Sequence, residues 1–156
     1  MKINLNQNKN LKLFKIISQV AEKNNQTVYI VGGYVRDLLM QRKAPTDIDF
    51  VTEQSGIELA KAVGKELGDL KVSVFKTYGT AMIKYKDLDL EFVGARKESY
   101  SEDSRKPAVE TGTLEDDQKR RDFTVNALAI SLNSENFGEL IDPFNGREDI
   151  DRKSVV

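Results

Sequence analysis

Two aspartates one residue apart are the first residues in this sequence whose types and spacing suggest chemistry. Asp47 and Asp49 lie in the stretch TDIDFVT, which predicts a short β-strand. Residues two apart in a strand point to the same face, so the carboxylates stand side by side while Ile48 turns into the core. Two adjacent carboxylates repel each other, and Mg²⁺ is bound by one or two carboxylates plus substrate phosphates. The pair therefore indicates a metal site for phosphate chemistry, although Asp-x-Asp also occurs in solvated turns and helix caps.

A glycine pair lies just before the aspartates in the sequence. The stretch TVYIVGGYVRDLLM predicts a buried strand, then Gly32 and Gly33, then a helix. Glycines at such a junction let the backbone approach a ligand, and a helix N-terminus favours an anion. Arg36, about one turn into the helix, can reach the same anion. A glycine pair can also be a simple tight turn, but beside the aspartates it suggests that these residues hold a polyphosphate whose metal the aspartates bind.

A third acidic side chain is available in the stretch DLDLEFV. Strand alternation places Asp87, Asp89 and Glu91 on one face, opposite the apolar residues between them. Glu91 lies deepest in the apolar run and is the candidate for the site. For Asp87 and Asp89 the simpler interpretation is a charged outer face of an edge strand.

The stretch KRRDFTVNALAI combines basic, acidic and amide side chains directly before an apolar segment. Arg121, Asp122 and Asn126 fall on a helix predicted over residues 113–132, in which Thr113 and Asp116 have the spacing of a capping box. An arginine and an amide on a rigid helix can bind a triphosphate and a sugar hydroxyl. A solvated charged surface is the alternative for the two basic residues that precede Arg121.

The remaining pattern predicts the elements that position these groups. Amphipathic periodicity predicts helices over about 9–24 and over 56–68, the second ending at Gly68. Residues 71–94 predict antiparallel strands with turns near 78–79 and 86–87. Residues 95–112 are polar and aperiodic, which predicts a mobile loop, and residues 139–150 predict a short strand and a turn.

Composition limits the class of protein and the kinds of chemistry. A chain of 156 residues, 39% hydrophobic and 31% charged, predicts one soluble domain. It contains no cysteine and no histidine, which excludes a disulfide framework, a thiolate zinc site and a Ser-His-Asp triad. A net charge of −1 argues against a uniformly basic surface. The absence of a membrane-length apolar run and of a signal-peptide pattern predicts a cytoplasmic protein with no membrane partner.

Several stretches, taken in order, resemble the catalytic head of the class II tRNA nucleotidyltransferase and bacterial poly(A) polymerase family. They are VGGYVRDLLM, TDIDFVT, YGTAMIKY, LEFVGARKESY, RRDFTVNALAI and IDPFNGREDI. The resemblance covers residues from about 12 to 153. It implies an α+β nucleotidyltransferase (polymerase beta-like) fold, with a mixed, mostly antiparallel sheet flanked by helices, and one head domain over residues 1–156. Tyr78 departs from the family pattern, which often has histidine there.

The resemblance also implies roles for individual residues. The implied catalytic residues are Asp47, Asp49 and Glu91, the first two as ligands of Mg²⁺. The implied contacts to the nucleotide are Gly33, Arg36 and Arg121, next to Gly32, with Asp122 and Asn126 in the motif linked with ribose recognition.

The function implied by the resemblance is template-independent addition of CCA to the tRNA 3′ end from CTP and ATP. Poly(A) addition to RNA 3′ ends, which uses the same head, is the near alternative. A module that binds nucleotide without transfer is the distant one. The family's neck, which reads the incoming base through a Glu-Asp-x-x-Arg motif, and the body and tail that grip tRNA are expected beyond Val156.

Overall fold

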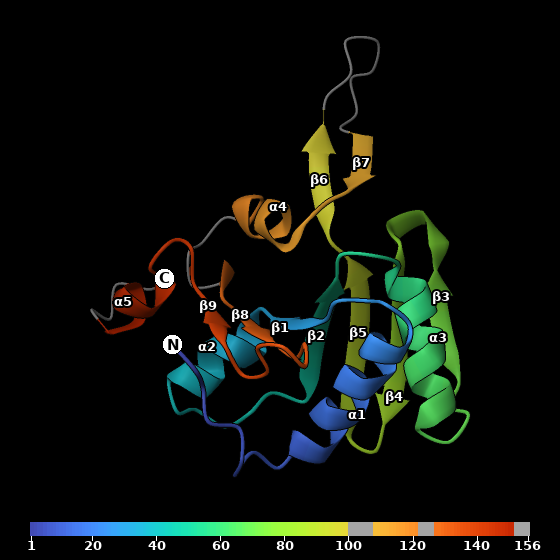
Figure 1. The fold of residues 1–156 in the computed structure, drawn as a ribbon, viewed down its shortest axis with the longest axis horizontal. Coiled ribbons are helices and arrows are strands. Elements are labelled where there is room, and N and C mark those ends of the chain that lie inside the picture. Colours follow the sequence, from blue (N-terminus) through green and yellow to red (C-terminus); the bar gives the residue numbers. More distant parts are fainter. Residues whose placement is uncertain (100–107, 122–126, 152–156) are drawn as a thin grey trace.

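The computed structural model describes residues 1–99, 108–121 and 127–151 (Figure 1). In chain order the elements are α1 (Leu11–Lys23), β1 (Tyr29–Val31), α2 (Gly33–Leu39), β2 (Asp47–Thr52), α3 (Gly56–Glu66), β3 (Val72–Phe75), a 3₁₀ turn (Lys76–Tyr78), β4 (Thr80–Tyr85), β5 (Leu88–Gly94), β6 (Arg96–Ser99), β7 (Ala108–Thr111), α4 (Leu114–Lys119), β8 (Ala129–Ser131), β9 (Leu140–Ile141) and α5 (Gly146–Asp151). The predicted helices over 9–24 and 56–68 are therefore confirmed.

A seven-stranded sheet in the order β3-β4-β5-β2-β1-β8-β9 forms the centre of the molecule. Strands β2 and β5 run parallel, and every other neighbouring pair in this sheet is antiparallel. Strands β3, β4 and β5 form the predicted antiparallel meander. The mixed, mostly antiparallel sheet flanked by helices is as predicted.

One face of the sheet is covered by helices α1 and α3, which lie side by side in Figure 1. Both helices are amphipathic, and their apolar faces pack on alternate residues of β2 and β5. Phe50 and Phe92 from these strands stack at 5.0 Å between ring centroids beneath the helices. Helix α3 begins where the Ser55 hydroxyl accepts a hydrogen bond from the Glu58 amide, and Gly68, with φ +113°, follows its end as predicted.

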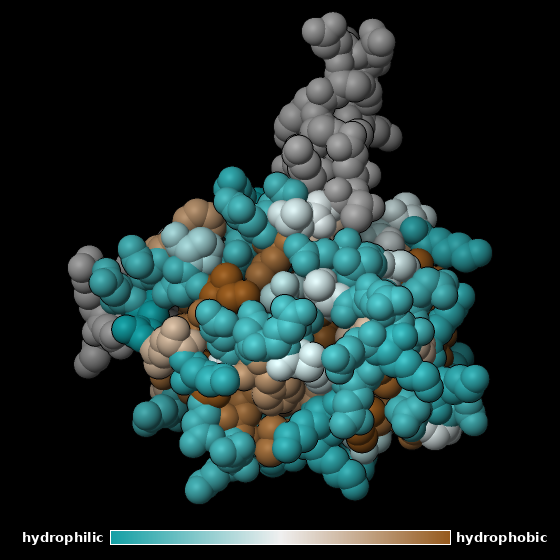
Figure 2. Space-filling view, in the orientation of Figure 1, coloured by the Kyte–Doolittle hydropathy of each residue, from teal (hydrophilic) through white to brown (hydrophobic). Residues whose placement is uncertain are grey.

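The opposite face carries a smaller apolar cluster and leaves room for polar side chains. The cluster consists of Tyr29, Val31, Val51, Ala95, Leu114 and Ala129. Leu114 comes from α4, so this short helix covers one part of the face and leaves another part open. Hydrophilic residues occupy most of the molecular surface seen in Figure 2, with hydrophobic patches between them.

The predicted loop over residues 95–112 is wrong at both of its ends. Strands β6 and β7 pair there as an antiparallel two-stranded ribbon, from Arg96 opposite Thr111 to Ser99 opposite Ala108, and the ribbon projects from the body of the molecule (Figure 1). A ribbon outside the main sheet is held by backbone hydrogen bonds and needs no buried face, so it leaves no apolar alternation in the sequence. Residues 100–107 lie outside the described part of the chain.

The single helix predicted over residues 113–132 is also wrong. Helix α4 ends at Lys119, and Ala129–Ser131 is strand β8, paired with β1. The capping box between Thr113 and Asp116 is present as predicted. Residues from Ala127 to Leu132 are all buried, and a short run that is apolar on every side does not distinguish a strand from a helix by periodicity.

Within the described ranges, none of the helices has the length and apolar character needed to cross a membrane.

Candidate active site

Acidic side chains from two parallel strands meet at the centre of the open sheet face. In the register of β2 and β5, Asp49 lies opposite Glu91 and Asp47 lies opposite Asp89. Ile48 and Leu90, the intervening residues, are buried on the helix-covered face. The predicted orientation of Asp47 and Asp49 opposite Ile48 is therefore confirmed, as is that of Glu91 opposite Leu90. The parallel pairing that brings Asp49 and Glu91 together was not predicted.

Asp49 is the electrostatically strained member of this group. The pKa of Asp49 is raised to about 6, first by burial and then by the charge of Glu91 and a side-chain hydrogen bond with it. The positive charge of Arg121 opposes this rise, whereas Asp47 adds a smaller increase. The carboxylates thus lie close enough to repel, and a bound cation would relieve that repulsion.

Gly32 brings the main chain directly against Asp49. Strand β1 pairs with β2 so that Val31 lies opposite Asp49, and Gly32 follows with φ +76°. A Cβ atom at Gly32 would lie 3.4 Å from Oδ2 of Asp49. A side chain here would strain the backbone and crowd the carboxylate, so this position requires glycine. The glycine pair and the aspartate pair are therefore neighbours in space.

Arg36 folds back over the glycine pair from α2. A Cβ atom at Gly33 would lie 3.2 Å from Nη2 of Arg36. The Nε atom of Arg36 donates a hydrogen bond to Oδ1 of Asp37 at 3.1 Å, which fixes the plane of the guanidinium group. This side chain is partly exposed, so its charge is accessible to an anion beside Gly33.

Arg121 follows the end of α4, and Asp117 of that helix holds its guanidinium group. The carboxylate of Asp117 is fully buried, and its Oδ2 accepts a hydrogen bond from Nε of Arg121 at 3.0 Å. Its Oδ1 accepts from Nε of Arg120 at 3.0 Å. Sequence reasoning missed Asp117, although its spacing of three and four residues from the two arginines is a recognisable ion-pair pattern.

Helix α4 is in turn fixed against the sheet. The buried side chain of Gln118 donates hydrogen bonds to the carbonyl oxygens of Ala127 at 2.8 Å and Ile141 at 3.2 Å. At its start, the amide of Leu114 donates to Oε2 of Glu53 at 3.0 Å. Asp117, which holds Arg121, therefore belongs to a helix anchored at both ends. Asp122 and Asn126, the predicted ribose contacts, lie outside the described residues.

The donor set suits a magnesium ion that shares its coordination with substrate. In the described ranges no three acidic side chains converge into a closed metal-binding cluster. Asp47 and Asp49 offer oxygen ligands from one strand, and substrate phosphates commonly supply the remaining ligands of Mg²⁺. The residues present therefore fit an open site for this ion.

Residues 28–156 match the family described as the poly(A) polymerase head domain. This chain belongs to that family. Among its relatives, the A-adding tRNA nucleotidyltransferase of Aquifex aeolicus is 46% identical over 127 residues, which cover 81% of this chain. A solved CCA-adding enzyme in an apo form superposes with a TM-score of 0.83 at 38% identity over 94% of this chain. A tRNA nucleotidyltransferase complexed with a primer tRNA and an incoming ATP analogue superposes with a TM-score of 0.75 at 42% identity over 86% of this chain.

This chain matches only part of the length of each of these relatives. This chain spans 15% of the Aquifex protein, and 34% and 36% of the two solved chains. The two superpositions cover 94% and 86% of this chain, so the nucleotidyltransferase fold implied by the resemblance is confirmed.

Proposed function

We propose that this chain is the catalytic head of an RNA 3′-end nucleotidyltransferase that adds CMP and AMP to tRNA. The observation that carries the proposal is the position of Asp49, which has Glu91 on one side and Gly32 and Arg121 on the other. Carboxylates are thereby placed beside a backbone and a guanidinium group that can receive phosphates. The tRNA nucleotidyltransferase names of relatives support tRNA as the acceptor.

Asp47 and Asp49 would hold Mg²⁺, which when bound stabilises negative charge on the reacting phosphate and on the leaving pyrophosphate. In the reaction, the RNA 3′-oxygen forms a bond to the α-phosphorus while the bond to pyrophosphate breaks. The hydroxyl proton needs an acceptor, and the chain contains no histidine. Glu91, hydrogen-bonded to Asp49, is the carboxylate we assign to receive it.

The basic and glycine residues orient the triphosphate. Gly32 and Gly33 let phosphate oxygens approach the main chain. Arg36 in α2 and Arg121, just after α4, supply positive charge. Positioning of this kind, together with electrostatic stabilisation, accounts for most of the rate in phosphoryl transfer. The ribose contacts remain assigned to Asp122 and Asn126.

Three reactions, which differ in the RNA acceptor and the nucleotide added, are compatible with this site. CCA addition from CTP and ATP is the proposed one. Addition of A alone is a second candidate, because the Aquifex relative is named as an A-adding enzyme. Poly(A) addition is the further alternative within the family. Domains outside these 156 residues would grip the RNA, and we place the reaction in the cytoplasm.

The experiment uses the whole protein that carries this chain, labelled CTP or ATP, Mg²⁺, and two tRNA substrates. One tRNA ends at the base before CCA, and the other ends in CC. A CCA-adding enzyme extends the first with C and then A, whereas an A-adding enzyme extends only the second and only with ATP. Long A tails on an unrelated RNA would indicate a poly(A) polymerase, and nucleotide binding without transfer would reduce the chain to a binding module.

A further inference from the structure

The open sheet face continues beyond Glu91, away from the glycine pair. Glu91 lies opposite Met82 of β4, and in the next row Val93 lies opposite Thr80, which lies opposite Phe75 of β3. Phe75 is 46% exposed, and Tyr78, in the turn after β3, is 65% exposed. Two large aromatic side chains thus stand in solvent on the same side of the molecule as the carboxylates.

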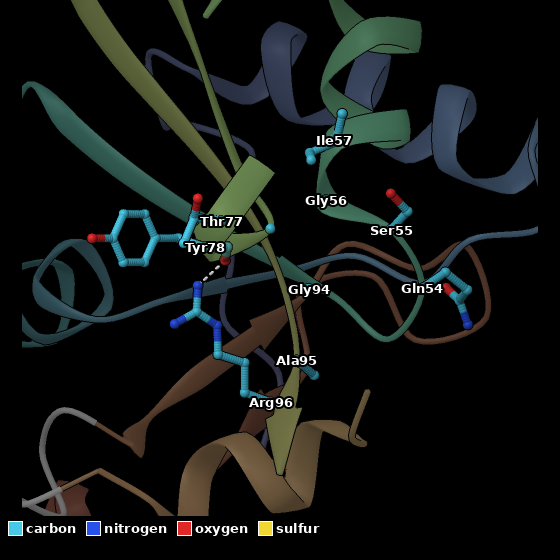
Figure 3. A pocket seen from close by; sticks show the side chains of 10 residues that line it. Gln54, Ser55, Gly56, Ile57, Thr77, Tyr78, Gly94, Ala95 and Arg96 are labelled. Carbon is cyan, nitrogen blue, oxygen red and sulfur yellow. Dashed lines mark hydrogen bonds between the residues drawn. The ribbon is translucent and has the colours of Figure 1, made fainter. Parts of the chain in front are cut away.

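These residues line a cleft that reaches the candidate active site. The cleft has a volume of about 340 Å³ and is lined by Phe75, Tyr78, Thr80, Met82, Glu91 and Arg96. Glu91 lines the cleft and also lies beside Asp49 in the candidate active site. A ligand in the cleft therefore lies directly beside the carboxylate that we assign to receive the proton. A larger cavity of about 580 Å³ next to the start of α3 shares Tyr78 and Arg96 with it. In Figure 3 the ring of Tyr78 points away from Ser55 and Gly56 of that cavity.

Arg96 gives the cleft a positive charge. Its Nη2 atom donates hydrogen bonds to the carbonyl oxygen of Tyr78, drawn as a dashed line in Figure 3, and to Oγ1 of Thr80. Among the side chains that the structure describes, none forms an ion pair with Arg96. Within the described part of the chain the guanidinium group is held by neutral acceptors, and its charge is available to a ligand.

The two sides of the carboxylates differ in the ligand that they can receive. On the β1 side, Gly32 lies against Asp49, Arg36 lies over Gly33, and the charge of Arg121 acts on Asp49, so the groups there suit phosphates. On the β4 side, the surface is aromatic and apolar with a single cation. In phosphoryl transfer the attacking and leaving oxygens are roughly in line on opposite sides of the phosphorus. If the triphosphate occupies the β1 side, the attacking hydroxyl arrives from the β4 side.

We propose that this cleft binds the 3′-terminal nucleotide of the acceptor RNA, with its base stacked on Phe75 and Tyr78 and its backbone phosphate paired with Arg96. The proposal rests on the proposed function and adds a specific place for the acceptor end. Single-stranded nucleic acid is bound by aromatic stacking next to positive charge, and stacking tolerates any base. An apolar segment of protein is the other possible occupant, but it would leave the charge of Arg96 without a partner.

The test separates stacking from simple apolar contact. Phe75→Leu keeps an apolar side chain and removes the ring, Phe75→Tyr keeps the ring, and Phe144→Leu changes an exposed phenylalanine that does not line the cleft. In the whole protein, KM is measured separately for a tRNA ending in CC and for ATP. A 2-aminopurine at the RNA 3′ end reports stacking through loss of its fluorescence.

We expect Phe75→Leu to raise KM for the RNA about tenfold and to abolish the fluorescence quenching, with KM for ATP unchanged. Phe75→Tyr and Phe144→Leu should leave KM for the RNA and the fluorescence quenching as in the wild type. Tyr78→Leu, in a more exposed turn, provides a second variant with the same expected loss. If KM for the RNA and the quenching survive Phe75→Leu and Tyr78→Leu, the inference is overturned. The proposed function has its own separate readout, because it fails if the wild-type protein transfers no nucleotide to tRNA or if Asp49→Ala still transfers AMP.

Discussion

Nε of Arg121 donates a hydrogen bond of 3.0 Å to Oδ2 of Asp117, a carboxylate with no exposed surface. The charge of Arg121 also lowers the pKa of Asp49, so this buried acid sets the position of a cation at the active site. Asp117 thus acts on the reaction through Arg121 and does not itself face the carboxylates from β2 and β5.

Replacing Asp117 should therefore affect nucleotide binding as well as stability. Asp117→Asn leaves Arg120 and Arg121 without their shared negative charge, which should cost about 2 kcal/mol of stability, since breaking a buried pair strands a charge. KM for ATP should rise at least fivefold because Arg121 is no longer held. The control is Glu115→Gln, which removes an exposed pairing with Lys119 on the same helix and should change neither value. Equal KM values for Asp117→Asn and wild type would contradict the positioning role.

Asp49 should make stability depend on pH. Its pKa is raised from 3.8 to about 6 in the folded protein, mainly by burial. Between about pH 4 and 6 the folded state keeps a proton that the unfolded chain loses, so stability falls as pH rises through this range. Asp49→Asn removes this effect. Without Mg²⁺ the variant should be more stable than wild type by about 1 kcal/mol at pH 7.5, after allowing for solvent screening.

The measurement for this prediction is urea unfolding of both proteins at pH 4 and at pH 7.5. The difference in the free energy of unfolding between Asp49→Asn and the wild type should be largest at pH 7.5 and should nearly vanish at pH 4. A wild type that is more stable than Asp49→Asn at pH 7.5 without metal would show that the carboxylate is not strained.

Gly32 should tolerate no side chain, for two separable reasons. Gly32→Ala strains a backbone with φ +76° and places a methyl group 3.4 Å from Oδ2 of Asp49. Gly68→Ala provides the matched control, because Gly68 has φ +113° but open space around its Cβ position. Both variants should lose about 1 kcal/mol of stability from backbone strain. Only Gly32→Ala should also reduce nucleotide transfer, at least tenfold, and equal activities of the two variants would mean that the close approach to Asp49 has no functional role.

Local patterns in the sequence were enough to predict the orientation of Asp47 and Asp49, because strand alternation depends only on neighbouring residues. The junction at Gly32 was predictable for the same reason. The pairing of Asp49 with Glu91 was not, since it depends on two distant segments choosing a parallel register. Strand β8 was mistaken for helix because its residues are buried on every side and show no period. Asp117 was overlooked among several acidic neighbours although its spacing from Arg120 and Arg121 is visible in the sequence, because its burial depends on how α4 packs.

Nucleotide affinity of this chain should come from the triphosphate. We assign Gly33, Arg36, Asp47, Asp49 and Arg121 to the binding of phosphate or metal, whereas the resemblance implies a base-reading motif outside these 156 residues. ATP, CTP, GTP and UTP should therefore bind with similar weak affinity, each requiring Mg²⁺ and each weakened by salt. Calorimetric titration of the 156-residue chain with the four nucleotides measures this. A preference for ATP or CTP over GTP beyond about tenfold, roughly 1.4 kcal/mol, would show that the head reads the base.

The most direct test of the account is AMP transfer to a tRNA ending in CC by whole protein carrying Asp47→Ala or Asp49→Ala. These side chains lie on the open face of the sheet and leave the buried core unchanged, so both variants should fold. Loss of a metal ligand removes several kcal/mol of charge stabilisation, and the single-turnover rate with Mg²⁺ should fall at least about a thousandfold in each variant. Transfer retained within tenfold of wild type in either variant would contradict the assignment of Asp47 and Asp49 as the metal-binding pair.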